Sequence, residues 1–221
     1  MNRKNLRSLA AGVALLLAVG ALAGCGGEKK ADDSKKMVTV GIAQLVEHGA
    51  LDAANKGFVA GMASKGFKEN ENVKYDRQNA QADQSNLQNI AQRFVSNKVD
   101  LICAIATPTA QTMANATKDI PIVATAVTDY EVAKLAASNN EPKGNVTGTS
   151  DMNPIDQQLE LLLKIAPQTK NIGTVYSSSE VNSQLQVDVL KKLAGDKGIN
   201  VIEATVSTVN DIQQAAHSLV G

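Results

Sequence analysis

Side chains able to bind a small charged molecule are gathered in short polar segments, each of which follows an apolar run. These candidate ligand-binding residues carry amide, carboxyl or hydroxyl groups, and they are Gln44, Glu47, Thr107, Thr109, Asp129, Ser177, Ser178, Glu180 and Ser183. A small zwitterion needs hydrogen-bond donors for its carboxylate and acceptors for its ammonium group. The set contains both kinds of group, so it predicts a binding site for a small solute.

The donors for a carboxylate are expected at Thr107 and Thr109. Pro108 lies between them, and proline is typical of the first turn of a helix. Free backbone amides and the helix dipole attract an anion to such a helix start. Capping of the same helix by Thr107 is an equally good interpretation, and one residue can do both.

Several other residues of these segments also have a structural alternative. Asp129 or Glu180 could pair with an ammonium group, but Asp129 also suits an ordinary loop, and Glu180 with Asn182 could cap the next helix. Tyr176 is compatible with stacking on an aromatic ligand or with packing at the end of a strand. Gln44 and Glu47 are expected to line a ligand-binding cleft, because their loop follows the first strand and ligands bind at the carboxyl ends of parallel strands.

Catalysis is not expected. The sequence contains no G-x-S-x-G, no G-x-x-x-x-G-K-[ST] and no G-x-G-x-x-G motif. The two histidines, His48 and His217, have no spaced ligand partners, so no metal or other cofactor is predicted. Cys103 lies in an apolar run, where a small buried hydrophobic role is expected.

The elements that position these residues alternate between strand and helix from residue 37 onward. The expected strands are 38–43, 73–78, 101–106, 122–126, 146–150, 171–176 and 199–204. The expected helices are 52–65, one starting at a cap on Asp83 or Ser85, one starting at Thr107, and 155–165, 182–195 and 210–219. This alternation predicts an α/β fold with parallel sheet.

Turn-rich residues and a proline place a domain boundary near residues 150–154. Residues 37–152 would form an N-terminal α/β lobe, and residues 153–221 part of a C-terminal one. The second lobe would contain two strands, and such a sheet is marginal alone. We therefore expect this lobe to be incomplete.

The first 36 residues have the pattern of a secretion signal followed by a tether. Arg3, Lys4 and Arg7 precede an apolar stretch and the segment Leu22-Ala23-Gly24-Cys25, which resembles a bacterial lipobox. Residues 1–24 are thus predicted to be a signal peptide, Cys25 to be lipidated, and residues 25–36 to be a flexible tether. The alternative is a soluble secreted protein with an incidental cysteine.

The charge balance excludes a typical nucleic-acid binder, because 22 basic residues face 22 acidic ones. Hydrophobic residues make up 43% of the chain, enough for a core, and aromatic residues only 3%. With Cys25 assigned to the lipid, Cys103 has no cysteine partner, so no disulfide within the chain is expected.

Six polar blocks in this order resemble the ABC transporter substrate-binding protein family of the TrpX type, which includes presumed tryptophan and tyrosine binders. The blocks are 44–52, 79–81, 106–108, 127–129, 148–151 and 176–183. The resemblance runs from about residue 37 to 221, but the family's C-terminal portion is missing. It implies a type I periplasmic-binding-protein fold, with two Rossmann-like lobes around a cleft, and a membrane permease and a cytoplasmic ATPase as partners.

The function expected from the resemblance is capture of an amino acid, with an aromatic one favoured, for an ABC importer outside the cytoplasm. Closure of the two lobes by hinge bending near Ser150–Asn153 would couple binding to docking on the permease. A sensory binding module that presents its ligand to a receptor would have the same cleft. A secreted hydrolase built on the serines of 176–183 is the weakest alternative, since no histidine is placed to serve it.

Overall fold

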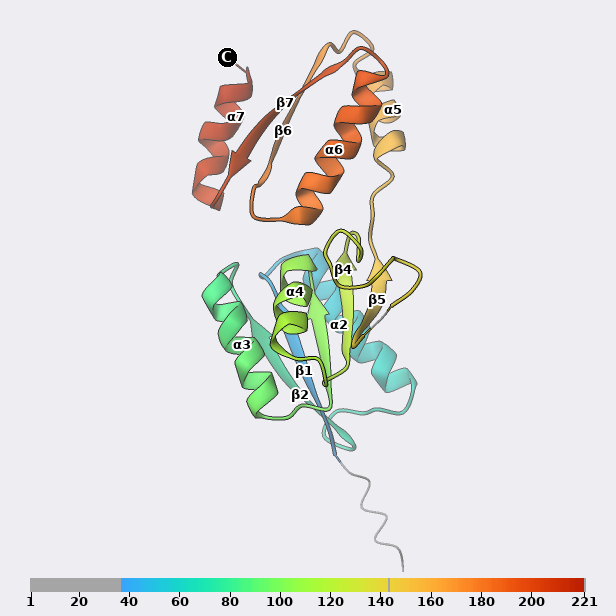
Figure 1. Ribbon diagram of the computed structural model, residues 1–221, viewed down its shortest axis with the longest axis vertical. Helices are drawn as coiled ribbons and strands as arrows, with labels where there is room; N and C mark the ends of the chain where they lie inside the picture. The colour runs from blue at the N-terminus through green and yellow to red at the C-terminus, as the bar shows by residue number, and fades with distance from the viewer. Residues whose placement is uncertain (1–36, 143, 221) are drawn as a thin grey trace, which may run out of the picture. The chain divides into compact units, whose positions relative to one another are not determined.

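The computed structural model describes residues 37–142 and 144–220, which form an α/β fold built on two parallel sheets (Figure 1). The first sheet has five strands in the order β2-β1-β3-β4-β5. Its strands are β1 (Val38–Gln44), β2 (Val73–Asn79), β3 (Leu101–Ile105), β4 (Ile122–Val127) and β5 (Val146–Ser150). The predicted signal peptide, Cys25 and the tether lie outside the described residues.

Both faces of the first sheet are apolar because helices cover both. Val40 and Ile42 of β1 face α2 (Gly49–Ser64), whereas Ala43 belongs to the cluster that includes α3 (Gln84–Ser96) and α4 (Thr107–Ala116). Figure 1 shows α3 and α4 on the side of the sheet opposite to α2.

The apolar face of α3 follows the helical period, with Leu87, Ile90, Ala91 and Phe94 buried. Phe94 packs so closely on β1 that a Cβ at Gly41 would lie 2.7 Å from its ring. Asp83 caps the helix, because its carboxylate accepts a hydrogen bond from Asn86 N at 2.8 Å. Of the two predicted caps, Asp83 is therefore the one used.

The second sheet consists of β6 (Asn171–Ser177) and β7 (Asn200–Val206), which pair in parallel. The helices α5 (Ile155–Ile165) and α6 (Val181–Gly195) share a small core with one face of this sheet, centred on Leu159, Ala194 and Ile199. A short 3-10 turn (Val209–Asp211) leads into α7 (Ile212–Val220), whose Leu219 packs at Gly173 of β6.

Most element bounds agree with the expected ones to within two residues. The largest difference is at α2, which begins at Gly49 rather than Asp52 because His48 accepts a hydrogen bond from Ala50 N and so caps the helix early. The predicted boundary near residues 150–154 falls between β5 and α5. Within the described part of the chain, no helix has the length and apolar character needed to span a membrane.

Candidate ligand-binding site

The carboxyl ends of the first sheet carry an unusual concentration of strained backbone. Ala106 follows β3 with φ 87°, Ala126 lies near the end of β4 with φ 55°, and Gln81 and Ala82 follow β2 with φ 56° and 60°. A positive φ is energetically unfavourable for a residue that has a Cβ, and residues with this conformation cluster at functional sites. This edge is also where open α/β sheets bind ligands, so the strain supports a site here. Sequence patterns do not reveal these backbone conformations.

The start of α4 provides the best candidate for binding an anion. Its N-cap residue is Ala106, which has no side chain able to cap the helix, so Thr107 does not serve as the cap as one interpretation proposed. Pro108 contributes no N–H, and the other first-turn amides have no partner within the helix. The helix therefore presents donors and the positive end of its dipole at the sheet edge.

Two buried hydroxyl groups lie in this first turn. Thr107 is 2% exposed and Thr109 is fully buried. Neither Oγ1 atom has a hydrogen-bond partner among the residues that the structure describes. A buried polar group without a partner costs free energy, so a molecule that formed hydrogen bonds with these two hydroxyls would remove that cost.

The side chain of Gln44 is hydrogen-bonded to other residues of the chain. Its amide nitrogen donates to Asp52 Oδ1 at 2.6 Å and to the Val46 carbonyl at 2.9 Å, and its Oε1 accepts from Asn55 Nδ2 at 3.3 Å. The side chain thus joins the end of β1 to the first turns of α2. This engagement leaves it little capacity to bind a solute directly.

A polar pocket of about 260 Å³ nevertheless brings Gln44 and Glu47 together. Its lining residues come from the end of β1, the start of α2 and the end of β2, and they are Gln44, Glu47, Asp52, Asn55, Arg77, Gln78 and Asn79. Sequence reasoning did not select Asp52 or Asn55 as lining residues. Their spacing of three in the first turns after β1 was the available signal.

Asp129 organises its own loop. Its Oδ1 accepts from Val132 N at 2.8 Å and its Oδ2 accepts from Asn139 Nδ2 at 2.8 Å. Asn139 in turn accepts from Tyr130 N at 2.7 Å. Both carboxylate oxygens therefore have partners within the chain, which favours the loop-acid alternative; pairing with an ammonium group stays a prediction.

The polar residues after β6 form loose contacts with one another. Ser177 Oγ lies 3.0 Å from Ser179 Oγ, and Glu180 Oε2 accepts from Asn182 Nδ2 at 3.3 Å and from Ser183 Oγ at 3.4 Å. Glu180 occupies the N-cap position of α6, but its side chain makes no cap hydrogen bond. The carboxylate of Glu180 is therefore held only weakly, as a group that binds a solute could be.

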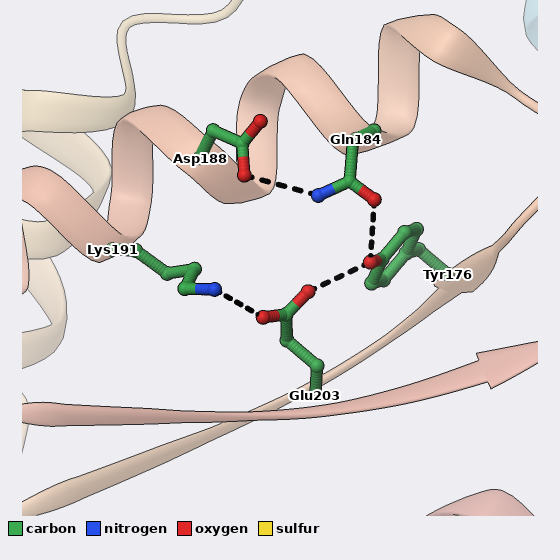
Figure 2. Close-up of polar contacts among 5 residues, drawn as sticks. All are labelled: Tyr176, Gln184, Asp188, Lys191 and Glu203. Atoms are coloured by element: carbon green, nitrogen blue, oxygen red, sulfur yellow. Dashed lines mark hydrogen bonds and ion pairs between the residues drawn. The ribbon is translucent and has the colours of Figure 1, made fainter.

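Tyr176 points into the space between the second sheet and α6. Its hydroxyl lies 2.7 Å from Glu203 Oε2 and 2.8 Å from Gln184 Oε1 (Figure 2). This arrangement agrees with packing at the strand end rather than with stacking on an aromatic ligand. Sequence reasoning did not select Glu203 or Gln184, because neither belongs to a polar loop.

Neither a reactive cysteine nor a metal centre is found among the described residues. Burial raises the pKa of the Cys103 thiol to about 12, so a reactive thiolate does not form near neutral pH. Within residues 37–142 and 144–220, no cluster of three or more histidine, cysteine or acidic side chains could hold a metal ion.

Residues 39–221 match the family model described as "ABC transporter substrate binding protein". A tyrosine-binding protein from Clostridioides difficile is 48% identical over 228 aligned residues, which cover 100% of this chain and 65% of that protein. The chain therefore spans slightly less than two thirds of the length of this relative.

Three of the solved structures that match are at least 40% identical to this chain. The L-Trp complex of an ABC domain from Streptococcus pneumonia is 40% identical, with a TM-score of 0.80 over 83% of this chain and 62% of that one. A conserved domain protein from Vibrio cholerae is 42% identical, with a TM-score of 0.81 over the same shares. A ligand-free, open substrate-binding protein with adhesive properties from Clostridium difficile is 50% identical, with a TM-score of 0.62 over 84% of this chain and 63% of that one.

A leucine-binding protein from Thermotoga maritima, 13% identical with a TM-score of 0.58, shares the fold alone. These neighbours confirm the predicted α/β architecture of type I periplasmic binding proteins. The relatives whose names state a function are named for binding a solute, in agreement with the prediction that the chain is not catalytic.

Proposed function

The chain belongs to the ABC transporter substrate-binding protein family, and from this premise we propose that the protein captures an amino acid outside the cytoplasm for an ABC importer. Substrate-binding proteins of ABC transporters are extracytoplasmic. The relatives named for tyrosine and for L-Trp favour an aromatic amino acid as the solute. A membrane permease with its ATPase would receive the solute, and a lipid on Cys25 would hold the protein at the membrane.

The observation that carries the proposal is the first turn of α4. Its first-turn backbone amides and the two unpartnered hydroxyls of Thr107 and Thr109 suit the α-carboxylate of an amino acid. Hydrogen bonds to a charged group are worth more than neutral ones. In this proposal the solute supplies the partner that the two buried hydroxyls lack.

The remaining polar residues would complete a cleft between two lobes, residues 37–152 and 153–221. Glu180, or Asp129 if its loop rearranges, would accept from the ammonium group, and Ser177, Ser178 and Ser183 would donate from the second lobe. Gln44 and Glu47 would border the site at the end of β1, where they share a polar pocket.

A thermal-shift screen of the mature full-length protein against the twenty amino acids tests the proposal. Ligand at about 100 times its dissociation constant adds roughly 2.7 kcal/mol of stability, which moves the midpoint by several degrees. A shift with tyrosine, tryptophan or phenylalanine is expected. A shift confined to another solute would replace the ligand, and no shift with any amino acid would contradict the proposed function.

Substitution of Thr109 by valine tests the carboxylate site itself. The hydroxyl has no hydrogen-bond partner among the described residues, so Thr109→Val should leave the stability without ligand unchanged or raised. Affinity for the amino acid should fall by about tenfold or more, since a hydrogen bond to a charged group is lost. Isothermal titration calorimetry measures the affinity, and thermal unfolding without ligand measures the stability.

Thr117→Val is the matched control at the other end of the same helix. Thr117 Oγ1 accepts from Asp119 N and Ile120 N at 3.2 Å each, so its loss should destabilise the free protein. Its distance in sequence from the α4 start predicts an unchanged affinity. Equal affinities of the Thr109→Val variant and the unsubstituted protein would reject the assignment of this site.

A further inference from the structure

A network of five polar side chains joins β6, β7 and α6 next to the loop that follows β6. It consists of Tyr176, Gln184, Asp188, Lys191 and Glu203 (Figure 2), and we call it the Tyr176 network. Beyond the Tyr176 contacts already described, Lys191 Nζ donates to Glu203 Oε1 at 2.5 Å and Gln184 Nε2 donates to Asp188 Oδ1 at 3.0 Å. The network thus connects both strands of the second sheet to one helix.

Glu203 is the centre of this network. The tyrosine hydroxyl has one proton and faces two acceptors, so it donates preferentially to the charged carboxylate, the stronger of the two. The other oxygen of Glu203 is paired with Lys191, whose charge keeps the carboxylate ionised. Glu203 therefore holds Tyr176 through a charge-assisted hydrogen bond and is itself held from α6.

The register of the sheet makes this contact a diagonal one. Thr174 lies opposite Glu203, and Tyr176 lies opposite Thr205, so the tyrosine side chain leans back over β7 to reach the carboxylate. Side chains alternate between the two faces along a strand. Fixing Tyr176 on the α6 face thus also fixes how Ser177, the next residue, leaves the sheet.

The loop after β6, residues 178–180, forms few hydrogen bonds with the rest of the protein before α6 begins at Val181. Ser178 N donates to the Val206 carbonyl and Glu180 N to the Ser177 carbonyl, while the side chains of the loop contact mainly one another. A sheet of two strands gives little support to its own ends. Orientation of the loop therefore depends on the residue that enters it, Tyr176.

We infer that Glu203 is a positioning residue: through Tyr176 it orients the Ser177–Ser183 segment toward the solute. This inference rests on the proposed function, since that segment carries residues proposed to bind the amino acid. Glu203 lies on β7, where its carboxylate bonds to Lys191 of α6 and to Tyr176. Its effect on binding is carried by the tyrosine hydroxyl.

The experiment uses the full-length protein with three substitutions in the Tyr176 network. Glu203→Ala removes the acceptor, Tyr176→Phe removes only the hydroxyl, and Glu203→Gln keeps a polar group of the same length that still accepts from Lys191 and contacts Tyr176. Glu160→Ala, which removes an exposed carboxylate from α5, is the control for the change in charge.

Two measurements are made on each protein. Calorimetric titration with L-tyrosine and L-tryptophan should show about tenfold weaker binding for Glu203→Ala and Tyr176→Phe, the size of a lost coupling between contacting residues. Glu203→Gln should bind within about twofold of the unsubstituted protein, as should the control. Hydrogen exchange without ligand should be about tenfold faster in residues 177–183 of the two weakened variants, with residues 171–174 unchanged, because the opening is local.

The outcomes separate the two proposals. If the unsubstituted protein binds no amino acid, the proposed function fails, while exchange in residues 177–183 still decides the positioning role. Unchanged exchange there in Glu203→Ala overturns the inference, and so does unchanged affinity in a protein that binds. Faster exchange throughout α6 and both strands would show general destabilisation and would also overturn it.

Discussion

Gly148 on β5 has no room for a side chain. A Cβ at this position would lie 1.9 Å from the Ala124 carbonyl oxygen and 2.2 Å from the Tyr130 hydroxyl. The Tyr130 hydroxyl is within hydrogen-bond distance of two backbone carbonyl oxygens, Ala124 O at 2.9 Å and Thr149 O at 3.2 Å. The glycine thus allows β5 to approach the end of β4, beside the loop that carries Asp129.

Replacement of Gly148 by alanine is expected to destabilise the protein by about 3 kcal/mol, the upper end of the usual cost of overpacking. Backbone atoms cannot move aside as a flexible side chain could, and the Tyr130 hydrogen bonds would be lost. Denaturant unfolding followed by circular dichroism measures the change. Gly57→Ala is the control, because a Cβ there contacts nothing within 4 Å and the helix should gain about 0.5–1 kcal/mol. Equal stability of the two variants would contradict this account.

Residue type alone did not show which polar side chains are available to bind a solute. Gln44, Asp129 and Thr109 were selected for the same reason, since each is a polar residue after an apolar strand. Of these three, Thr109 has an unpartnered buried hydroxyl, as does its neighbour Thr107, whereas the amide of Gln44 and the carboxylate of Asp129 have partners. Residue type identifies a group able to bind, but its existing hydrogen bonds decide whether it is available.

At the scale of elements, ion pairs tie β2, an edge strand, to its neighbours. Arg77 on β2 forms two hydrogen bonds to Glu69, at 2.6 and 2.9 Å, and Arg93 on α3 pairs with Asp76 at 2.7 Å. The Arg77 guanidinium also lies over the Tyr75 ring, 4.8 Å from its centroid. The hydrogen bond from Arg77 lowers the pKa of Glu69 below its ordinary value of 4.5.

This pKa shift predicts how stability depends on pH. A carboxyl group whose pKa is lower in the folded than in the unfolded state stabilises the protein above its unfolded pKa, and that contribution disappears as the pH falls through the folded pKa. Stability should therefore decline as the pH falls below about 4.5. The effect of this one pair is small because both side chains are partly exposed.

Comparison of unfolding midpoints between pH 6 and pH 3 for Glu69→Gln and the unsubstituted protein measures the contribution. The variant should be less stable at pH 6, and the difference should shrink toward pH 3. Glu160→Gln, at an exposed position on α5, serves as the control. A difference that stays constant over this range would show that the pair does not contribute through its charge.

At the scale of the whole molecule, the proposed function requires the two lobes to rotate relative to each other. Residues 151–154 lead from β5 of the first sheet to α5, which packs on the second sheet. In the proposed mechanism, binding of an amino acid closes the two lobes by rotation at this crossover, and the closed form docks on the permease.

Small-angle X-ray scattering of the full-length protein tests the closure. The radius of gyration should decrease when the amino acid found in the thermal-shift screen is added, and it should stay constant with an amino acid that does not bind. An unchanged radius with a bound ligand would contradict hinge closure while leaving the binding function intact.

The sequence by itself determined the types of the elements and their order. Alternation of apolar strands with amphipathic helices is a local pattern, and the resulting α/β architecture with parallel strands is confirmed by the sheets and by the structural neighbours. The family could also be recognised, since its polar blocks lie in short stretches of chain.

Only the tertiary structure decided which side chains are available for binding. Tyr176 and Glu203 are 27 residues apart in the chain, and Asn55 and Gln44 are 11 apart, so the sequence pattern does not show that they meet. The strained backbone at Ala106, which places the start of α4 at the sheet edge, likewise depends on how strand and helix pack. Local patterns determine secondary structure because their causes are local, whereas a binding site is built from contacts between distant segments.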